Sequence, residues 1–459
     1  MMRRMRSPAP IAVAALALAG VLASAPAAAA AARASGLTSL ERKLAIEVDR
    51  HTPSSLVLLQ RAVDINSGTG NHAGVREVGR LFEDELSAMG FHTHWMDGGP
   101  WGRAGHLVAE RTREGGAHAK PGPRPKVVLV GHLDTVFEAD SPFQRFVKLD
   151  DSTATGPGVI DMKGGDVVML LALRALHATG ELDRLDVSVV MTGDEENPGR
   201  PIDAARADLV RAAQGAIAAI GFEDGDGEPH HVIVSRRGSS GWTLHVHGTP
   251  SHSSQVFTGD VGIGAIYEAA RILERFRDSL AVEPYLTFNP GLILGGTSIT
   301  HDPPVSRGTA FGKSNVVAET TLVSGDLRTL TLEQREHAKA TMARIVADGT
   351  PHTEAKLVFD DSYPPLGPSE GNRRLLALVD RASRDLGFGA MEPVDPARAG
   401  AADVSFLGGL VPRLIDAMGM KGSGGHTVQE TGRLRSLPLQ AKRVAVALSR
   451  LSREAAALP

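Results

Sequence analysis

Histidine and carboxylate residues stand directly after apolar stretches of this sequence, where buried strands would end. His132 and Asp134 follow such a stretch in KVVLVGHLDTV, and Glu195 and Glu196 follow another in VSVVMTGDEE. The carboxyl ends of parallel strands lie at one edge of a sheet, so these side chains would be neighbours. Imidazoles and carboxylates bind divalent metal ions, and the pattern therefore predicts a metal site at that edge.

Three further stretches add candidates of the same kind. Asp161 lies in the glycine-rich turn GPGVIDMKGG, Glu223 ends a short apolar run in GFED, and His426 lies in GSGGHT. Each stretch alone is also typical of solvated turns, and only their joint placement at one sheet edge favours a site. Because Asp224 follows Glu223 directly, either carboxylate could be the ligand.

Together these candidates supply two imidazoles and three carboxylates. If Asp161 bridges, two divalent ions each receive three protein ligands and keep an open position for water. One set is His132, Asp161 and Glu223, and the other is Asp161, Glu196 and His426. Three carboxylates nearly balance the charge of two such ions, so a hydroxide would be well held at neutral pH.

Two acidic residues remain beside this set. Glu195 is adjacent to Glu196 and suits a general base that takes a proton from water and passes it to a leaving amine. Asp134 suits a carboxylate that orients His132 through its other ring nitrogen.

Composition excludes several other chemistries. The chain of 459 residues has no cysteine, which excludes disulfides, thiolate nucleophiles and thiolate-bound zinc. A net charge of −4 and an aromatic content of 4% give no support for a nucleic-acid partner. There is no G-x-S-x-G motif, which disfavours a serine hydrolase.

The N-terminus resembles a secretory signal. Arg3, Arg4 and Arg6 precede an apolar run at about 11–22 and then alanine-rich sequence. We expect residues 1–35 to be cleaved, leaving a periplasmic or secreted protein with no membrane attachment. A retained N-terminal anchor is the rival interpretation.

The elements that must position the candidates alternate between strand and helix at first. Residues 36–235 show this α/β pattern, residues 236–350 switch to an inserted α+β unit, and residues 351–459 resume the first pattern. Residues 232–248 are expected to form a hairpin, and residues 202–213 one helix. The predicted metal ligands all lie in the first and last parts.

The chain resembles a family of dinuclear zinc peptidases and aminoacylases, which includes carboxypeptidase G, succinyl-diaminopimelate desuccinylase and carnosinase. The matching pieces, in family order, are GHLDTV, GPGVIDMKGG, TGDEEN, GFE, GTPSHSS, SNVV with GDLR, and GHT. The resemblance implies a phosphorylase/hydrolase-like zinc-exopeptidase fold, α/β with a mixed, mostly parallel sheet. It also implies an inserted ferredoxin-like lid domain that often forms a homodimer. It supports the ligand set and the general base given above, with Glu223 favoured over Asp224, and two zinc ions, with cobalt or manganese as alternatives.

Further roles come from the resemblance alone. His252 matches the lid histidine that polarises the scissile carbonyl, often across a dimer. Asn315 and Arg328 match lid positions that hold the carboxylate end of the substrate, although Arg328 could instead pair with Asp326. The Asp161–Met162 bond lies where the family often has a cis peptide. The chain departs from the glutamate carboxypeptidases at Tyr363, where they have a carboxylate-binding arginine.

These features together predict a metal-dependent hydrolase that cleaves an amide bond. A metal-bound hydroxide would attack small peptides or N-acylated amino acids, with Glu195 as the base. An aminoacylase-type deacylase is the alternative within the same chemistry. A non-catalytic envelope binding protein that retains the fold is a further alternative, and the complete ligand set disfavours it.

Overall fold

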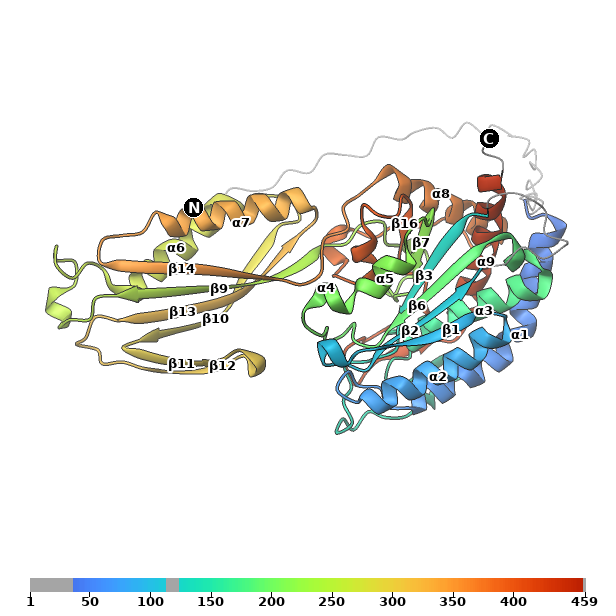
Figure 1. Cartoon of the computed structure of the whole chain (residues 1–459), viewed down its shortest axis with the longest axis horizontal. Helices are drawn as coiled ribbons and strands as arrows, with labels where there is room; N and C mark the ends of the chain where they lie inside the picture. The colour runs from blue at the N-terminus through green and yellow to red at the C-terminus, as the bar shows by residue number, and fades with distance from the viewer. Residues whose placement is uncertain (1–35, 113–123, 457–459) are drawn as a thin grey trace, which may run out of the picture. The chain divides into compact units, whose positions relative to one another are not determined.

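The computed structural model describes residues 36–112 and 124–456. The predicted signal segment 1–35 lies outside the described residues. The described chain has two lobes, each with its own main sheet. The lid lobe is Gly238–Asp361, and the main lobe comprises the described residues on either side of it (Figure 1).

A six-stranded sheet forms the centre of the main lobe. Strand β3 is parallel to β6 and β7, and β7 is parallel to β16, whereas β1 and β2 are antiparallel. The mixed, mostly parallel sheet that the sequence predicted is therefore confirmed. In spatial order the strands are β1 (His92–Asp97), β2 (Gly105–Arg111), β6 (Asp186–Thr192), β3 (Lys126–His132), β7 (Ala218–Gly221) and β16 (Leu414–Ile415).

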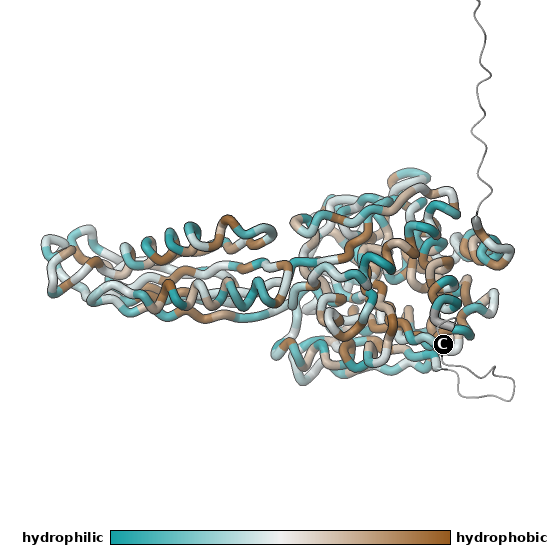
Figure 2. The backbone as a smooth tube through the Cα atoms, turned by 90° about the horizontal axis from the view of Figure 1, so that it is seen from above, coloured by the Kyte–Doolittle hydropathy of each residue, from teal (hydrophilic) through white to brown (hydrophobic). Residues whose placement is uncertain are grey.

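Apolar layers cover both faces of this sheet. Val127 and Leu129 of β3 belong to the larger core cluster, and Val128 and Val130 belong to the second. A strand covered on both sides has a continuous apolar sequence, which is why this strand was visible in the sequence. Figure 2 shows hydrophobic segments running through the interior of the main lobe.

Six of the seven α-helices in the described part of the main lobe contribute to these layers. The larger cluster contains residues of the long helices α1, α2, α3, α8 and α9, and the second contains residues of α5. No helix in the described ranges is both long and apolar enough to cross a membrane. The seven α-helices of the main lobe are α1 (Ser39–Asp64), α2 (His72–Ala88), α3 (Lys163–Thr179), α4 (Ile202–Ala205), α5 (Ala207–Ala212), α8 (Glu370–Asp385) and α9 (Ser436–Ala456).

The lid lobe has a separate four-stranded antiparallel sheet. Its strand order is β10-β13-β9-β14, and its chain order of strands and helices is the split βαββαβ arrangement of ferredoxin-like folds. Both helices pack on the sheet around Trp242 and Phe276. The elements are β9 (Gly238–Gly248), α6 (Gly264–Leu280), β10 (Thr287–Gly296), β13 (Thr320–Thr329), α7 (Leu332–Ala347) and β14 (Thr353–Asp361).

Two local predictions were wrong. Residues 232–248 do not form a hairpin, because β9 is one long strand that pairs with the distant strands β13 and β14. Residues 202–213 form two short helices that meet at Arg206. The segment 295–313 between the lid strands β10 and β13 contains the hairpin β11 (Ser298–Asp302) and β12 (Arg307–Phe311).

A small sheet in the main lobe brings two distant loops together. β18 (Thr431–Arg433) pairs with both β17 (Gly422–Ser423) and β5 (Thr153–Thr155), and β5 pairs with β4 (Val147–Lys148). His426 lies between β17 and β18, and Asp161 follows β5. The pairing of β18 with β5 therefore holds these two loops side by side.

Candidate metal centre and active site

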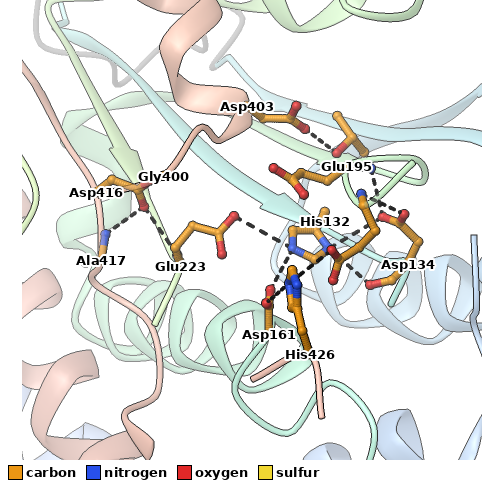
Figure 3. Close-up of polar contacts among 12 residues, drawn as sticks. His132, Asp134, Asp161, Glu195, Glu223, Gly400, Asp403, Asp416, Ala417 and His426 are labelled. Carbon is orange, nitrogen blue, oxygen red and sulfur yellow. Dashed lines mark hydrogen bonds and ion pairs between the residues drawn. The ribbon is translucent and has the colours of Figure 1, made fainter. Parts of the chain in front are cut away.

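His132 lies at the carboxyl end of β3, buried to 1% exposure, and faces two carboxylates. Its Nε2 lies 3.1 Å from Oδ1 of Asp161 and 3.7 Å from Oε1 of Glu223 (Figure 3). Asp161 precedes α3, and Glu223 lies just beyond β7, the strand next to β3. Three separate segments thus supply one compact group of candidate metal-ligand atoms, here called a donor group.

A second group shares Asp161 with the first. Nε2 of His426 lies 2.9 Å from Oδ2 of Asp161 and 3.2 Å from Oε2 of Glu196. His426 has a left-handed backbone with a φ of 62°. This conformation is costly for a residue other than glycine and is concentrated at functional sites. The peptide between Asp161 and Met162 is cis, as the resemblance implied.

The chemistry of these two groups fits divalent cations. Within each group the candidate ligand atoms lie within 4.8 Å of one another. Oε1 of Glu196 is buried and accepts no hydrogen bond, and burial raises the pKa of both Glu196 and Glu223. Hydrogen bonds to Asp161 and Glu196 raise the pKa of His426 to about 11. Crowded carboxylates of this kind are stabilised by positive charge, which two metal ions would supply.

The carboxylate of Asp134 organises the surroundings of both groups. Oδ1 accepts a hydrogen bond from the backbone N–H of Glu195 at 3.0 Å, and Oδ2 accepts one from that of Glu196 at 3.1 Å. Oδ2 also accepts the Thr69 hydroxyl at 2.7 Å. The Nδ1 of His132 lies 3.0 Å from the backbone oxygen of Asp134 and 3.4 Å from its Oδ1. The carboxylate of Asp134 thus lies beside His132, although the His132 Nδ1 is closer to the backbone oxygen of Asp134, and it also holds the segment that carries Glu195.

The Glu195 side chain is free within the part of the chain that the structure describes. Its backbone N–H donates to Asp134 and its backbone oxygen accepts a hydrogen bond from the Tyr363 hydroxyl. Its carboxylate forms no hydrogen bond or ion pair among the described residues. Burial raises the pKa of this carboxyl well above its usual range. A free carboxyl with a raised pKa at the edge of a metal site suits proton transfer.

Of the two adjacent acidic residues, Glu223 rather than Asp224 belongs to the donor group. The backbone N–H of Glu223 donates to Oδ1 of the buried Asp416 at 3.3 Å, and Asp416 also accepts from Arg236 at 2.9 Å. Gly221 is required beside this pair, because a Cβ there would lie 2.3 Å from Oδ1 of Asp416.

Glu430 holds the loop that contains Asp161. Its buried carboxylate accepts backbone N–H groups of Gly158 at 3.0 Å, Ile160 at 2.8 Å and Asp161 at 3.2 Å. Glu430, Thr69 and Asp416 were not predicted from the sequence. Each of them contacts residues that are distant in the chain, and no spacing of residues in the sequence predicts such contacts.

The lid residues form a separate set. Ser253, next to His252, donates its backbone N–H to the oxygen of Asn315 at 2.9 Å, so His252 and Asn315 lie on adjacent segments. Nε of Arg328 donates a hydrogen bond to the carboxylate of Asp326. Among the described residues, these lid side chains make no hydrogen bond or ion pair with the donor groups.

Comparison with known proteins identifies the family. A sequence profile of peptidase family M20/M25/M40 matches residues 128–450. The chain belongs to this family. It is 23% identical over 385 residues to carboxypeptidase G2 of Pseudomonas sp. (strain RS-16), covering 82% of this chain and 83% of that protein. It is 30% identical over 151 residues to succinyl-diaminopimelate desuccinylase of Delftia acidovorans, covering 31% of this chain and 36% of the relative.

Solved structures share the fold. Aminopeptidase PepT of Bacillus cereus superposes with a TM-score of 0.68 at 18% identity, covering 87% of this chain and 98% of that chain. Human carnosine dipeptidase 1 superposes with a TM-score of 0.58 at 14% identity, covering 90% of this chain and 100% of that chain. The predicted fold class and family resemblance are confirmed, and the protein is a metallopeptidase by family.

Proposed function

We propose that this M20-family protein is a dinuclear metal hydrolase that cleaves amide bonds in small peptides or N-acylated amino acids. The observation that carries the proposal is the pair of donor groups joined through Asp161, with the free carboxylate of Glu195 beside them. Membership of the M20 family and a sequence match that spans most of carboxypeptidase G2 support the same chemistry.

The proposed ligands divide as the two donor groups do. His132 and Glu223 would hold one ion, Glu196 and His426 the other, and Asp161 both. When bound, the ions supply Lewis-acid activation of the substrate carbonyl and of water. Zinc is favoured because the ligands are imidazole nitrogen and carboxylate oxygen, with cobalt and manganese as alternatives.

The protein's own side chains perform the remaining steps. Glu195 accepts a proton from water and returns it to the departing amine. His252 of the lid polarises the scissile carbonyl, and Asn315 and Arg328 bind the free carboxylate of the substrate. These lid roles rest on the family resemblance, as does a homodimer through the lid.

Replacing the general base tests this assignment. A Glu195→Gln variant keeps the size of the side chain but cannot accept the proton, so kcat should fall about a thousandfold while metal content stays unchanged. The exposed residue Glu77 on α2 provides a matched control, and Glu77→Gln should keep wild-type turnover. Normal turnover by Glu195→Gln would remove Glu195 from the mechanism.

The substrate class needs a separate panel. Tyr363 stands where the glutamate carboxypeptidases have a carboxylate-binding arginine, and this departure favours a specificity other than glutamate. Dipeptides and N-acyl amino acids should be compared as substrates. Release of a fatty or aromatic acid in preference to an amino acid would identify the aminoacylase-type alternative.

We also propose export to the periplasm or the medium, on the basis of the N-terminal segment 1–35. N-terminal sequencing of the mature protein from each cell fraction tests this. A cytosolic protein that begins at Met1 would contradict it.

A further inference from the structure

Tyr363 lies in the connection that leaves the lid lobe after β14 and is 6% exposed. Its hydroxyl donates to the backbone oxygen of Glu195 at 2.8 Å. The same hydroxyl accepts a hydrogen bond from Nη2 of Arg206 at 2.9 Å. The phenol therefore joins the proposed general base to a buried arginine.

Arg206 is the centre of a buried cluster around the Glu195 segment. Its Nε donates to Oδ1 of Asp403 at 2.6 Å, and its Nη1 donates to Oδ1 of Asp194 at 2.6 Å. Nη2 also donates to the backbone oxygen of Asp194 at 3.1 Å. Asp403 in turn accepts the hydroxyl of Thr192, the last residue of β6. The guanidinium thus holds the segment 192–194 where it leaves the sheet.

These contacts complete the restraint on Glu195. Asp134 accepts the N–H of Glu195, and Tyr363 donates to its carbonyl oxygen, so both backbone polar groups of this residue are fixed. The carboxylate is the only part left without a partner in the described structure. Fixing a backbone while leaving its side chain free is the arrangement that an oriented general base requires.

The same contacts exclude a direct role for this cluster in binding substrate. The Tyr363 hydroxyl already donates one hydrogen bond and accepts another. Every nitrogen of Arg206 donates to a protein oxygen, and its side chain is 1% exposed. Neither residue has a free polar group for a substrate carboxylate.

We propose that Tyr363 and Arg206 are positioning residues that orient Glu195, a role that rests on the proposed function of Glu195 as the base. In this chain the tyrosine restrains the segment that carries the proposed base. Tyr363 acts through the carbonyl of Glu195, and Arg206 acts through Tyr363, Asp194 and Asp403.

The test removes one oxygen atom. Tyr363→Phe keeps the ring, which packs against Phe406 at a centroid distance of 5.4 Å and lies 5.7 Å from the Arg206 guanidinium. Tyr267→Phe is the matched control, because Tyr267 is 57% exposed on α6. Hydrogen exchange of the segment 192–199 is measured on the metal-free full chain, and kcat, KM and metal content are measured on the loaded enzyme.

Tyr363→Phe should speed amide exchange in this segment and lower kcat about ten- to a hundredfold, with KM and metal content near wild type. Asp403→Asn should speed exchange in the same segment, and Tyr267→Phe should change neither quantity. Unchanged exchange in Tyr363→Phe would overturn the proposal. A raised KM with unchanged kcat would instead make Tyr363 a substrate contact and would also overturn it. If wild-type protein hydrolyses no peptide or acyl amino acid, the proposed function fails, while the exchange measurement still decides whether Tyr363 restrains the segment.

Discussion

At the residue scale, one carboxylate links the proposed metal ligands to the proposed general base. Asp134 accepts the N–H groups of Glu195 and Glu196 and the Thr69 hydroxyl, and it lies beside His132. Its position two residues after His132 was enough to predict the contact with that imidazole. The three other contacts come from residues about 60 positions away in the chain. No local spacing encodes them, so they required the structure.

Asp134→Asn tests this linking role. The asparagine keeps the shape of the side chain, but one of its two oxygens is replaced by an NH₂ group, which cannot accept a hydrogen bond. At least one of the N–H and O–H groups that Asp134 binds would then lose its acceptor. We expect the free energy of unfolding to fall by about 1–3 kcal/mol in urea denaturation of metal-free protein. Asp84→Asn, an exposed substitution on α2, should leave it unchanged. Equal stability of Asp134→Asn and wild type would show that these hydrogen bonds contribute little.

At the element scale, the long apolar strands were predictable and the short pairings were not. β3 and β6 are buried on both faces, so their sequences are mostly apolar. β5, β17 and β18 have two or three residues each, too few to show a period, yet their pairing holds His426 beside Asp161. Glu430, which directly precedes β18, also joins the two segments by accepting the backbone N–H groups of Gly158 and Ile160.

A buried carboxylate in the lid predicts a pH-dependent stability. Glu268 on α6 accepts two hydrogen bonds from Arg271, at 2.6 and 2.7 Å, and the Thr350 hydroxyl at 3.0 Å. Although burial opposes it, hydrogen bonds from Arg271 and Thr350 hold the pKa of Glu268 below its usual range. A lowered pKa in the folded state stabilises the protein above the unfolded pKa, and this stabilisation is lost as the pH falls through the folded value.

Glu268→Gln should therefore destabilise the protein by about 1–2 kcal/mol at pH 7. The difference from wild type should shrink as the pH falls below about 4, where the wild-type carboxyl becomes protonated in the unfolded state. Urea denaturation at several pH values measures both. A difference that stays constant with pH would show that the charge of Glu268 does not contribute.

At the scale of the whole molecule, the proposed activity depends on two metal ions bound at the edge of the main sheet. The sequence predicted which five side chains meet there, because each follows a strand or lies in a glycine-rich turn of a family motif. The restraint on Glu195 could not be predicted in the same way. It joins Thr192, Arg206, Tyr363 and Asp403 from separate parts of the chain.

Elemental analysis of divalent metal per chain, for wild type and Asp161→Ala, tests the central claim most directly. Wild type should bind two ions per chain and lose peptide hydrolysis on chelation. Asp161→Ala should retain neither ion at full occupancy, because this carboxylate contacts both donor groups. Asp151→Ala, at an exposed turn, should keep both ions. Two ions retained by Asp161→Ala, or full hydrolysis by metal-free wild type, would contradict the account.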